Sequence, residues 1–464
     1  MDDQNQKLIR RIASLIKENQ ELLLQKETYA KLNADLLDEN QRLRQLLEST
    51  TQKNQLEVLD KQKDEDLRFN MATVLFANIH GFTKIATSSN SEALMDELDT
   101  IFLKFDNIAK KFNIQKIKTI GDTYMCAGGI PVKNQTNPIE VVLAALEMKE
   151  FLTSLQGSLD VRQKIWDIRL GIHTGPVSAN ITGKRKVAYD IKGETVNIAS
   201  RIESSADMDK LFISIMTYEL VKEFFDCDYY GRVPVKYTGD LELFVVKSIK
   251  PEYTVDGMGI APNEKFNTKF ALIKFFDLQE LILDRLEREL PENLYYHNVK
   301  HTVDVVTEVE LIGWAEGISE EEILLLKTAA LFHDAGHIIS YDNHENYGAD
   351  LAREYLPNFN YSVGQINKIC DLIMATKLPP NPKNKLEEIM CDSDLDYLGR
   401  SDFIPVSNTL YKELKERSKI GTLNEWNKLQ IDFISNHQYF TKTARNLREV
   451  NKQKQIDRIK KLIV

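Results

Sequence analysis

The sequence predicts a multidomain chain: an N-terminal parallel coiled coil, a central α+β domain and a C-terminal all-α domain. At 464 residues it is too long for one hydrophobic core, and domain-size statistics favour about three units. Residues 1–66 contain no Pro or Gly, strand-like and helix-like segments alternate from about residue 70, and helical periodicity dominates beyond about residue 269. These changes of pattern divide the chain into 1–66, 67–249, a linker at 250–268, and 269–464.

Residues 1–66 carry a seven-residue repeat. One set of positions is mostly Leu, and the set four residues further on is mostly polar. The first set is Leu8, Leu15, Leu22, Tyr29, Leu36 and Leu43, and the second is Ile12, Asn19, Lys26, Asn33, Asn40 and Leu47. Asn at the a position of a heptad pairs with its mate in a parallel two-stranded coil, so the repeat predicts a parallel homodimer. The alternative is a single amphipathic helix folded onto its own domain.

The central region reads as strands alternating with helices. The strand-like segments are MATVLFANI, IQKIKTIGDTYMCAGG, WDIRLGIHTGPVSANI and LELFVVKSI, and the helix-like segments are SEALMDELDTIFLKFDNIAKKF and PIEVVLAALEMKEFLTSLQG. Residues 250–268 contain Pro, Gly and Asn without periodicity, which is typical of a linker. Beyond it, Ser319 and the acids that follow it predict the first turn of a helix.

Bulk composition narrows the function classes. The chain is 42% hydrophobic and 28% charged, as in soluble globular proteins, and 60 Lys and Arg against 70 Asp and Glu give a net charge of −10. This charge disfavours nucleic acid as a partner. No segment approaches the roughly 18 consecutive apolar residues of a membrane span, and the first residues lack the features of a signal peptide, so we expect a cytoplasmic protein without a membrane partner.

Cysteine spacing argues against a disulfide framework or a zinc knuckle. The four cysteines are scattered without any CxxC pair, at Cys126, Cys227, Cys370 and Cys391. We expect reduced, buried thiols.

Histidines are concentrated in the helical region, where five of the eight fall within 48 residues: His297, His301, His333, His337 and His344. The spacing of the first two predicts that they share one helix face with Asp304. His333 and Asp334 end an apolar helical segment, where an unpaired carboxylate would be costly. Imidazole and carboxylate ligands suit a divalent ion such as Zn, Mn, Fe or Mg, and they leave room for a bound water of lowered pKa.

The segments YYHNVKH, FHDAGH and DSDLDYLG resemble the motifs of the HD-superfamily metal-dependent phosphohydrolases. The opening YHNxxHxxDV is similar to the signature of the helical cyclic-nucleotide phosphodiesterases. The resemblance implies metal ligands at His301, His333, Asp334 and Asp394, with Asp392 as the alternative to Asp394. It also implies that Asp334 bridges a second ion and holds a hydroxide nucleophile, that His297 is the general acid for the leaving ribose oxygen, and that His337 is a supporting or substrate contact. Two further segments, Asp342–Glu345 and Ala375–Lys377, match bacterial members of the superfamily.

The central region resembles the class III nucleotidyl cyclases across about 70–249, a family with a ferredoxin-like fold. The motifs are VLFANIHGFT, KIKTIGDTYM, GIHTGPV and YDIKGETVNIASR, in this order. Catalysis in that family uses two metal ions held by two Asp residues. Asp122 matches the second, whereas Asn78 stands where the first is expected.

The resemblance also assigns nucleotide contacts. Lys118 and Asp190 match the base-reading pair of adenylate cyclases, and Asn197 and Arg201 match the residues that stabilise the transition state. Two other departures are the loop Val235–Gly239, which replaces the family's VKGKG, and Asn180 in place of a glycine. Because an amide brings no charge to a metal beside a triphosphate, we expect weak or absent turnover with nucleotide binding, to ATP or GTP, retained.

Together these observations predict a homodimeric phosphodiesterase that hydrolyses a 3′,5′-cyclic nucleotide, cAMP or cGMP, to the 5′-monophosphate. Its helical domain would hold one or two divalent ions and would be regulated by nucleotide binding to the cyclase-like domain. Three alternatives remain: an active or bifunctional adenylate cyclase, a non-catalytic nucleotide sensor that signals through the coiled coil, and a phosphatase acting on nucleoside monophosphates or ppGpp.

Overall fold

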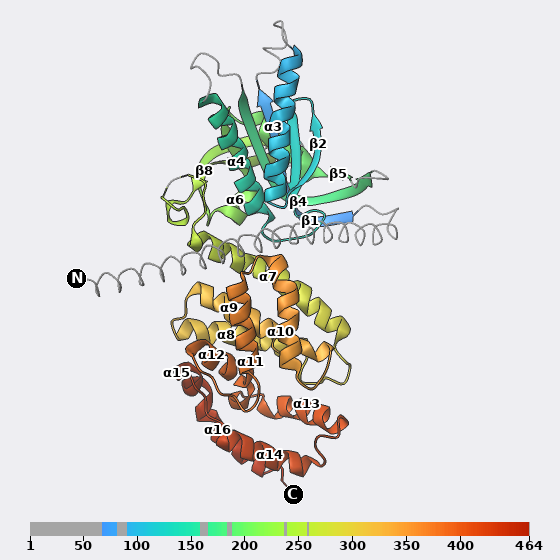
Figure 1. Ribbon diagram of the computed structural model, residues 1–464, viewed down its shortest axis with the longest axis vertical. Helices are drawn as coiled ribbons and strands as arrows, with labels where there is room; N and C mark the ends of the chain where they lie inside the picture. The colour runs from blue at the N-terminus through green and yellow to red at the C-terminus, as the bar shows by residue number, and fades with distance from the viewer. Residues whose placement is uncertain are drawn as a thin grey trace, which may run out of the picture. The chain divides into compact units, whose positions relative to one another are not determined.

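The computed structural model describes residues 67–80, 91–157, 166–182, 188–235, 239–257 and 259–463 (Figure 1). The predicted coiled coil at 1–66 lies outside the described residues. Across these ranges, no helix combines the length and the apolar character that crossing a membrane requires. All four cysteines are free thiols, as expected from their spacing.

The central region forms a mixed sheet with helices, as predicted. In the part of the chain that the structure describes, the sheet has eight strands: seven follow the order β2-β3-β1-β4-β6-β8-β7, and the eighth, β5, pairs with β4. Strands β4 and β6 pair in parallel, whereas β1–β3, β2–β3, β4–β5, β6–β8 and β7–β8 pair antiparallel. The strands are β1 Leu67–His80, β2 Gln115–Ile120, β3 Thr123–Gly128, β4 Asp167–Thr182, β5 Ala188–Lys192, β6 Lys210–Ser214, β7 Phe225–Val235 and β8 Gly239–Ile249.

Helices cover both faces of this sheet, and the alternation of side chains along β6 shows why. Leu211 and Ile213 point to one face and join a core with α3, α4 and α6. Phe212 points to the other face, where it packs against Ile198 and Ile202 of α5. The helices are α3 Ser91–Lys111, α4 Asn137–Gly157, α5 Glu194–Ser205 and α6 Ile215–Val221.

The segment 114–129, predicted as one strand-like run, is a hairpin of β2 and β3. Gly121 turns the chain with φ of 62°, a left-handed conformation that favours glycine, and Asp122 follows it. Strand β3 then pairs with β1 so that Thr123 lies opposite Asn78. This register brings Asp122 and Asn78, which are distant in sequence, to the same end of the sheet.

The region beyond the sheet is helical, as predicted. Its main core is built from α7, α8, α9, α10, α11 and α12. Ser319 and Glu322 form a reciprocal capping box, so α9 begins where its sequence predicts. The helices are α7 Glu264–Glu289, α8 Val299–Ala315, α9 Glu320–Phe332, α10 His344–Tyr355, α11 Val363–Ala375, α12 Lys385–Asp394, α13 Phe403–Glu416, α14 Leu423–Asn436, α15 Lys442–Ala444 and α16 Val450–Lys460.

Helix α7 begins inside the segment predicted as the 250–268 linker. Asn263 caps it by accepting the Phe266 N–H at 3.0 Å, and the asparagine that was taken as a loop residue is therefore a helix-start signal. Phe266 belongs to the core of the sheet domain, whereas Phe275 belongs to the helical core. One helix thus contributes to both hydrophobic cores.

Candidate functional site

His297 and His301 do not lie on one helix, contrary to the spacing argument. Helix α8 starts at Val299, and Asn298 caps it by accepting the N–H groups of Lys300 at 2.9 Å and His301 at 3.2 Å. His297 therefore precedes the helix, and the cap turns the chain between the two imidazoles. The two rings still lie close, with centroids 6.1 Å apart.

A candidate metal centre forms where α8, the end of α9 and the end of α12 meet. His301, His333 and Asp394 offer ligand atoms that all lie within 4.8 Å of one another. His301 Nε2 is 3.2 Å from Asp394 Oδ1 and 3.3 Å from His333 Nε2. The Nδ1–H of His333 donates to Ala330 O at 2.7 Å, so its Nε2 lone pair faces the cluster, as ligation of a metal requires.

Asp334 lies between this cluster and a second one. Its Oδ2 is 3.3 Å from His333 Nε2 and 3.4 Å from His301 Nε2, while its Oδ1 is 3.4 Å from His344 Nε2 and 3.9 Å from His337 Nε2. The second group of possible ligands is His297, Asp334 and His337. One carboxylate therefore faces two groups of imidazoles.

The electrostatics of the centre favour added positive charge. Burial opposes protonation of His333, but the Asp334 and Asp394 carboxylates outweigh it and raise the pKa of His333. Burial lowers the pKa of His337 to about 3, so this imidazole is neutral and can offer a lone pair. Among the described residues, Asp334 Oδ2 and both ring nitrogens of His337 are buried without a hydrogen-bond partner. Two imidazoles, two carboxylates and these unpartnered atoms fit a divalent cation.

The stacking of His337 on His344 depends on Gly336. Their rings are 4.0 Å apart and 16° from parallel, because the turn Ala335–Ile338 packs directly on the start of α10. A Cβ on Gly336 would lie 1.9 Å from the backbone oxygen of His344, a distance that no side chain tolerates. Sequence reasoning left the role of Asp342–Glu345 open, and the contact between His344 and Asp334 now gives this segment a place in the site.

Glu413 was missed from the sequence. Its buried carboxylate accepts the Nδ1–H of His297 at 2.5 Å and the backbone N–H groups of Tyr296 and His297 at 3.0 and 3.2 Å. Burial acts to raise the pKa of Glu413, but these hydrogen bonds and the charge of His297 outweigh it and lower the pKa. Glu413 lies in a charge-rich segment of α13, ELKERSK, which reads as a solvated face, so no signal near it marked a buried acid.

The choice between Asp392 and Asp394 is resolved by their hydrogen bonds. Asp392 is fully buried and accepts the N–H groups of Phe440 at 2.9 Å and Thr441 at 2.7 Å, so it anchors the segment before α15. Asp394 faces His301 and His333 instead. Of the two, only Asp394 has a carboxylate available to the metal centre.

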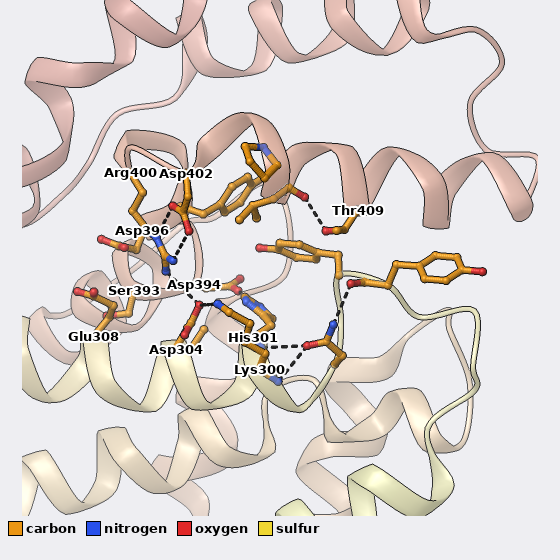
Figure 2. Close-up of a pocket in the computed structure, with 17 residues that line it drawn as sticks. Lys300, His301, Asp304, Glu308, Ser393, Asp394, Asp396, Arg400, Asp402 and Thr409 are labelled. Carbon is orange, nitrogen blue, oxygen red and sulfur yellow. Dashed lines mark hydrogen bonds and ion pairs between the residues drawn. The ribbon is translucent and has the colours of Figure 1, made fainter.

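Asp304 does not face the metal centre, because the side chains of Lys300 and Arg400 form ion pairs with its carboxylate. Lys300 Nζ lies 2.7 Å from Asp304 Oδ2, and Arg400 donates to the same oxygen at 3.1 Å (Figure 2). Arg400 also binds Asp402, and the network borders a cavity of about 290 Å³ whose wall includes His301 and Asp394. These ion pairs involve Lys300 and Asp304 of α8, on either side of His301 in the sequence.

A larger cavity of about 490 Å³ opens on the other side of the centre. Its lining includes His297, Asp334, His337, His344 and Asp394. The lining also includes apolar side chains, among them Leu398, Phe403, Leu414, Trp426, Leu429 and Phe433. A cavity lined by ionic groups and by aromatic and aliphatic groups fits a ligand with a phosphate and a flat organic group.

The predicted nucleotide contacts of the sheet domain lie in three separate pairs. Lys118 on β2 and Asp190 on β5 form an ion pair at 2.8 Å. Asn197 and Arg201, both on α5, line a cavity of about 600 Å³. Asn78 and Asp122 form the third pair, in which Asn78 Nδ2 donates to Asp122 Oδ1 at 3.1 Å.

Comparison with known proteins finds relatives for both domains. Residues 65–248 match the model of the adenylate and guanylate cyclase catalytic domain, and residues 298–399 match that of the HD domain. Guanylate cyclase 32E of Drosophila melanogaster is 33% identical over 195 residues, which are 40% of this chain and 16% of that protein. An adenylate cyclase of Mycobacterium tuberculosis is 34% identical over 172 residues, 37% of this chain and 38% of that protein.

Solved structures similar to this chain are also cyclase domains. The guanylate cyclase domain of RhGC from Catenaria anguillulae in complex with GTP is 29% identical, covers 39% of this chain and 98% of that chain, and has a TM-score of 0.36. The adenylyl cyclase CyaB from P. aeruginosa is 28% identical with a TM-score of 0.37. The chain spans less than two fifths of the length of the first curated relatives it matches.

Proposed function

We infer a role in cyclic-nucleotide signalling, because this chain joins a domain of the class III cyclase family at 65–248 to a domain of the HD family at 298–399. We propose that the HD domain hydrolyses a 3′,5′-cyclic nucleotide to the 5′-monophosphate. The observation that carries the proposal is the position of His297. This imidazole is anchored to buried Glu413 and lies in the same cavity as Asp334 and Asp394. A proton donor beside a cluster of metal ligands is what cleavage of a phosphodiester requires.

The roles of the residues follow from this geometry. A divalent ion held by His301, His333, Asp334 and Asp394 would supply positive charge to the nonbridging phosphate oxygens and lower the pKa of a bound water. His297, held through Nδ1, presents Nε2 as the donor of a proton to the leaving ribose 3′ oxygen. The apolar part of the cavity lining, with Phe403 and Trp426, accommodates the base.

The cyclase-like domain is proposed as the regulatory part. Its Lys118–Asp190 pair, Asn197 and Arg201 match the nucleotide contacts of the family, and binding there would change the activity of the HD domain as a coupling between two sites. The homodimer and the coiled coil remain part of this proposal. Adenylate cyclase activity is the second candidate, because the same four residues are present, but the contact between Asn78 and Asp122 argues against turnover.

One assay tests the proposal. Purified full-length protein with Mn²⁺ or Mg²⁺ is incubated with a panel of cyclic mono- and dinucleotides, with and without ATP or GTP, and products are separated by chromatography. Release of a 5′-monophosphate from a cyclic mononucleotide is expected. If no cyclic substrate yields a 5′-monophosphate, the proposal is wrong. Cyclic AMP formed from ATP would favour the second candidate, adenylate cyclase activity.

A further inference from the structure

The end of β1 holds an amide where a cyclase holds a metal ligand, and this amide is already occupied. Asn78 Nδ2 donates to Thr123 Oγ1 at 2.6 Å and to Asp122 Oδ1 at 3.1 Å. The pairing of Asn78 with Thr123 across β1 and β3 fixes this geometry through the backbone. Both hydrogens of the amide are therefore used within the domain.

The orientation of the amide follows from chemistry. A carboxylate only accepts hydrogen bonds, so an amide oxygen placed against Asp122 would be repelled, whereas the amide nitrogen is attracted. Asn78 Oδ1 is consequently turned away from Asp122, and it is buried without a hydrogen-bond partner among the described residues. A cation between the two side chains would require the amide to turn over and to lose both hydrogen bonds.

The donor set at this position does not fit a divalent cation. Hard cations beside phosphates need anionic oxygens that converge on one point. Here a single carboxylate faces an N–H donor, so the partial positive charge of the amide takes the place that a cation would have. Without a cation, a nucleoside triphosphate would bring its full negative charge towards Asp122.

We propose that the cyclase-like domain binds its nucleotide without a divalent cation, and that this ligand is a cyclic nucleotide with one negative charge rather than a metal-bound triphosphate. Arg201 is the cationic group among the residues that line this cavity with Asn197 and Ser200. It is exposed on α5 and forms no ion pair with any residue in the described ranges. One guanidinium matches one phosphodiester charge. The inference rests on the proposed function in that it assumes that this domain takes a nucleotide.

The cation is tested by counting bound Mn²⁺ in the full chain by electron paramagnetic resonance, with a nonhydrolysable ATP analogue present. The Asn78→Asp variant is expected to bind about one more Mn²⁺ per chain than the wild type, because it restores the second anionic ligand. Wild type, Asn78→Ala and Asp122→Asn are expected to bind equal amounts, since the HD domain contributes the same background to each. A loss of Mn²⁺ in Asp122→Asn relative to the wild type would overturn the proposal.

The identity of the ligand is tested by measuring how fluorescent cAMP and cGMP analogues bind to the full chain in the presence of EDTA. Binding is expected to persist without metal and to weaken at least tenfold in Arg201→Ala, because the charge-assisted contact is lost, with partial recovery in Arg201→Lys. Lys192→Ala, an exposed lysine on β5, is the matched control and is expected to leave binding unchanged. Binding that ignores Arg201, or binding only of a triphosphate with Mg²⁺, would contradict the proposal.

The two proposals fail separately. If hydrolysis with metal is absent but Arg201-dependent binding in EDTA remains, the proposed function falls and this inference stands. If hydrolysis occurs but cyclic nucleotides bind only through the HD domain, so that Arg201→Ala leaves binding unchanged, the proposed function stands and this inference falls.

Discussion

The two candidate sites of this chain use similar polar groups in opposite ways. At the end of β1, the amide nitrogen of Asn78 donates to Asp122 and Thr123, and its Oδ1 is left without a hydrogen-bond partner among the described residues. In the helical domain, Asp334 Oδ2 and both nitrogens of His337 are buried without hydrogen-bond partners among the described residues. Buried polar atoms that stay unsatisfied are costly unless a ligand completes them. The helical domain thus buries a carboxylate oxygen and two imidazole nitrogens that a cation could complete, which supports the proposal that catalysis takes place there.

The largest effect is expected from removing the helical cluster itself. The double variant His333→Ala/Asp334→Ala loses one imidazole and the bridging carboxylate, so hydrolysis of the cyclic nucleotide should fall by more than about 10³-fold and bound metal should fall with it. Metal analysis and product chromatography measure both. Asp371→Asn, an exposed position on α11, is the control. Hydrolysis that survives the double substitution would remove the HD domain from the reaction.

Substitution of His297 separates proton donation from metal binding. His297→Asn should lower kcat by about 10²- to 10⁴-fold while the metal content stays unchanged, because the lost group donates a proton. A phosphodiester with a p-nitrophenolate leaving group, which needs no protonation, should be much less affected. If the variant instead loses metal, His297 is a ligand of the second group, and the proton donor has been misassigned.

A smaller effect is expected from Glu413, which positions His297 without facing the substrate. Glu413→Gln keeps the shape but weakens the hold on Nδ1, so kcat should fall by about 10- to 100-fold with KM little changed. Glu416→Gln, one helical turn along α13 and exposed, is the matched control. A rise in KM with kcat unchanged would place Glu413 in binding rather than in positioning.

Acid should destabilise both domains through one buried histidine in each. Burial lowers the pKa of His173 and of His437 to about 4 in each case. Because the unfolded chain binds these protons from about pH 6.5, stability should be full above that pH and fall as the pH decreases towards 4, by at most ~3 kcal/mol per group.

The test is denaturant unfolding at pH 7 and pH 5, followed through tryptophan fluorescence. His437→Phe should remove part of the acid sensitivity, since the ring lies among Phe433 and Tyr439 and would lose only its titration. Equal acid sensitivity in wild type and variant would show that other groups govern the transition.

The smallest effect is expected at the ion pair of the cyclase-like domain. Lys118 and Asp190 have side chains that are 44% and 36% exposed, so Lys118→Met should cost less than about 1 kcal/mol of unfolding free energy. Denaturant unfolding measures this value. A larger loss of unfolding free energy would mean that the pair stabilises the packing of β2 against β5 rather than serving to bind a ligand.

Much of the fold followed from local patterns. The helices α8 and α9 and the long strands β1 and β4 appear where periodicity predicts them. The capping box at Ser319 appears where the residue types predict a helix start. The short strands β5 and β6 were not predicted as separate elements, because segments of five residues carry too little periodicity. The 12-residue helix α5 was not predicted either. The start of α7 was missed because Asn263 was read as a loop residue rather than as a cap.

The site could be predicted only where spacing encodes it. His301, His333 and Asp394 come together as the motif order suggests. Glu413 lies 116 residues from His297 in sequence, so only tertiary packing reveals the contact. Asp304 lies on α8 one turn beyond His301, as its spacing predicts, but its ion pairs with Lys300 and Arg400 could not be read from the spacing.

Gly336 gives the helical domain an evolutionary weakness. Because this residue has no side chain, the backbone of α10 comes close enough for His344 to stack on His337. Every nonsynonymous single-base change in a glycine codon would either add a side chain at this contact or end the chain there. A substitution at this position is therefore expected to disrupt the packing of His337 on His344 and to leave the sheet domain intact. Asn78 is its counterpart in the sheet domain, where an amide stands at the position of the expected carboxylate and donates to Asp122 and Thr123.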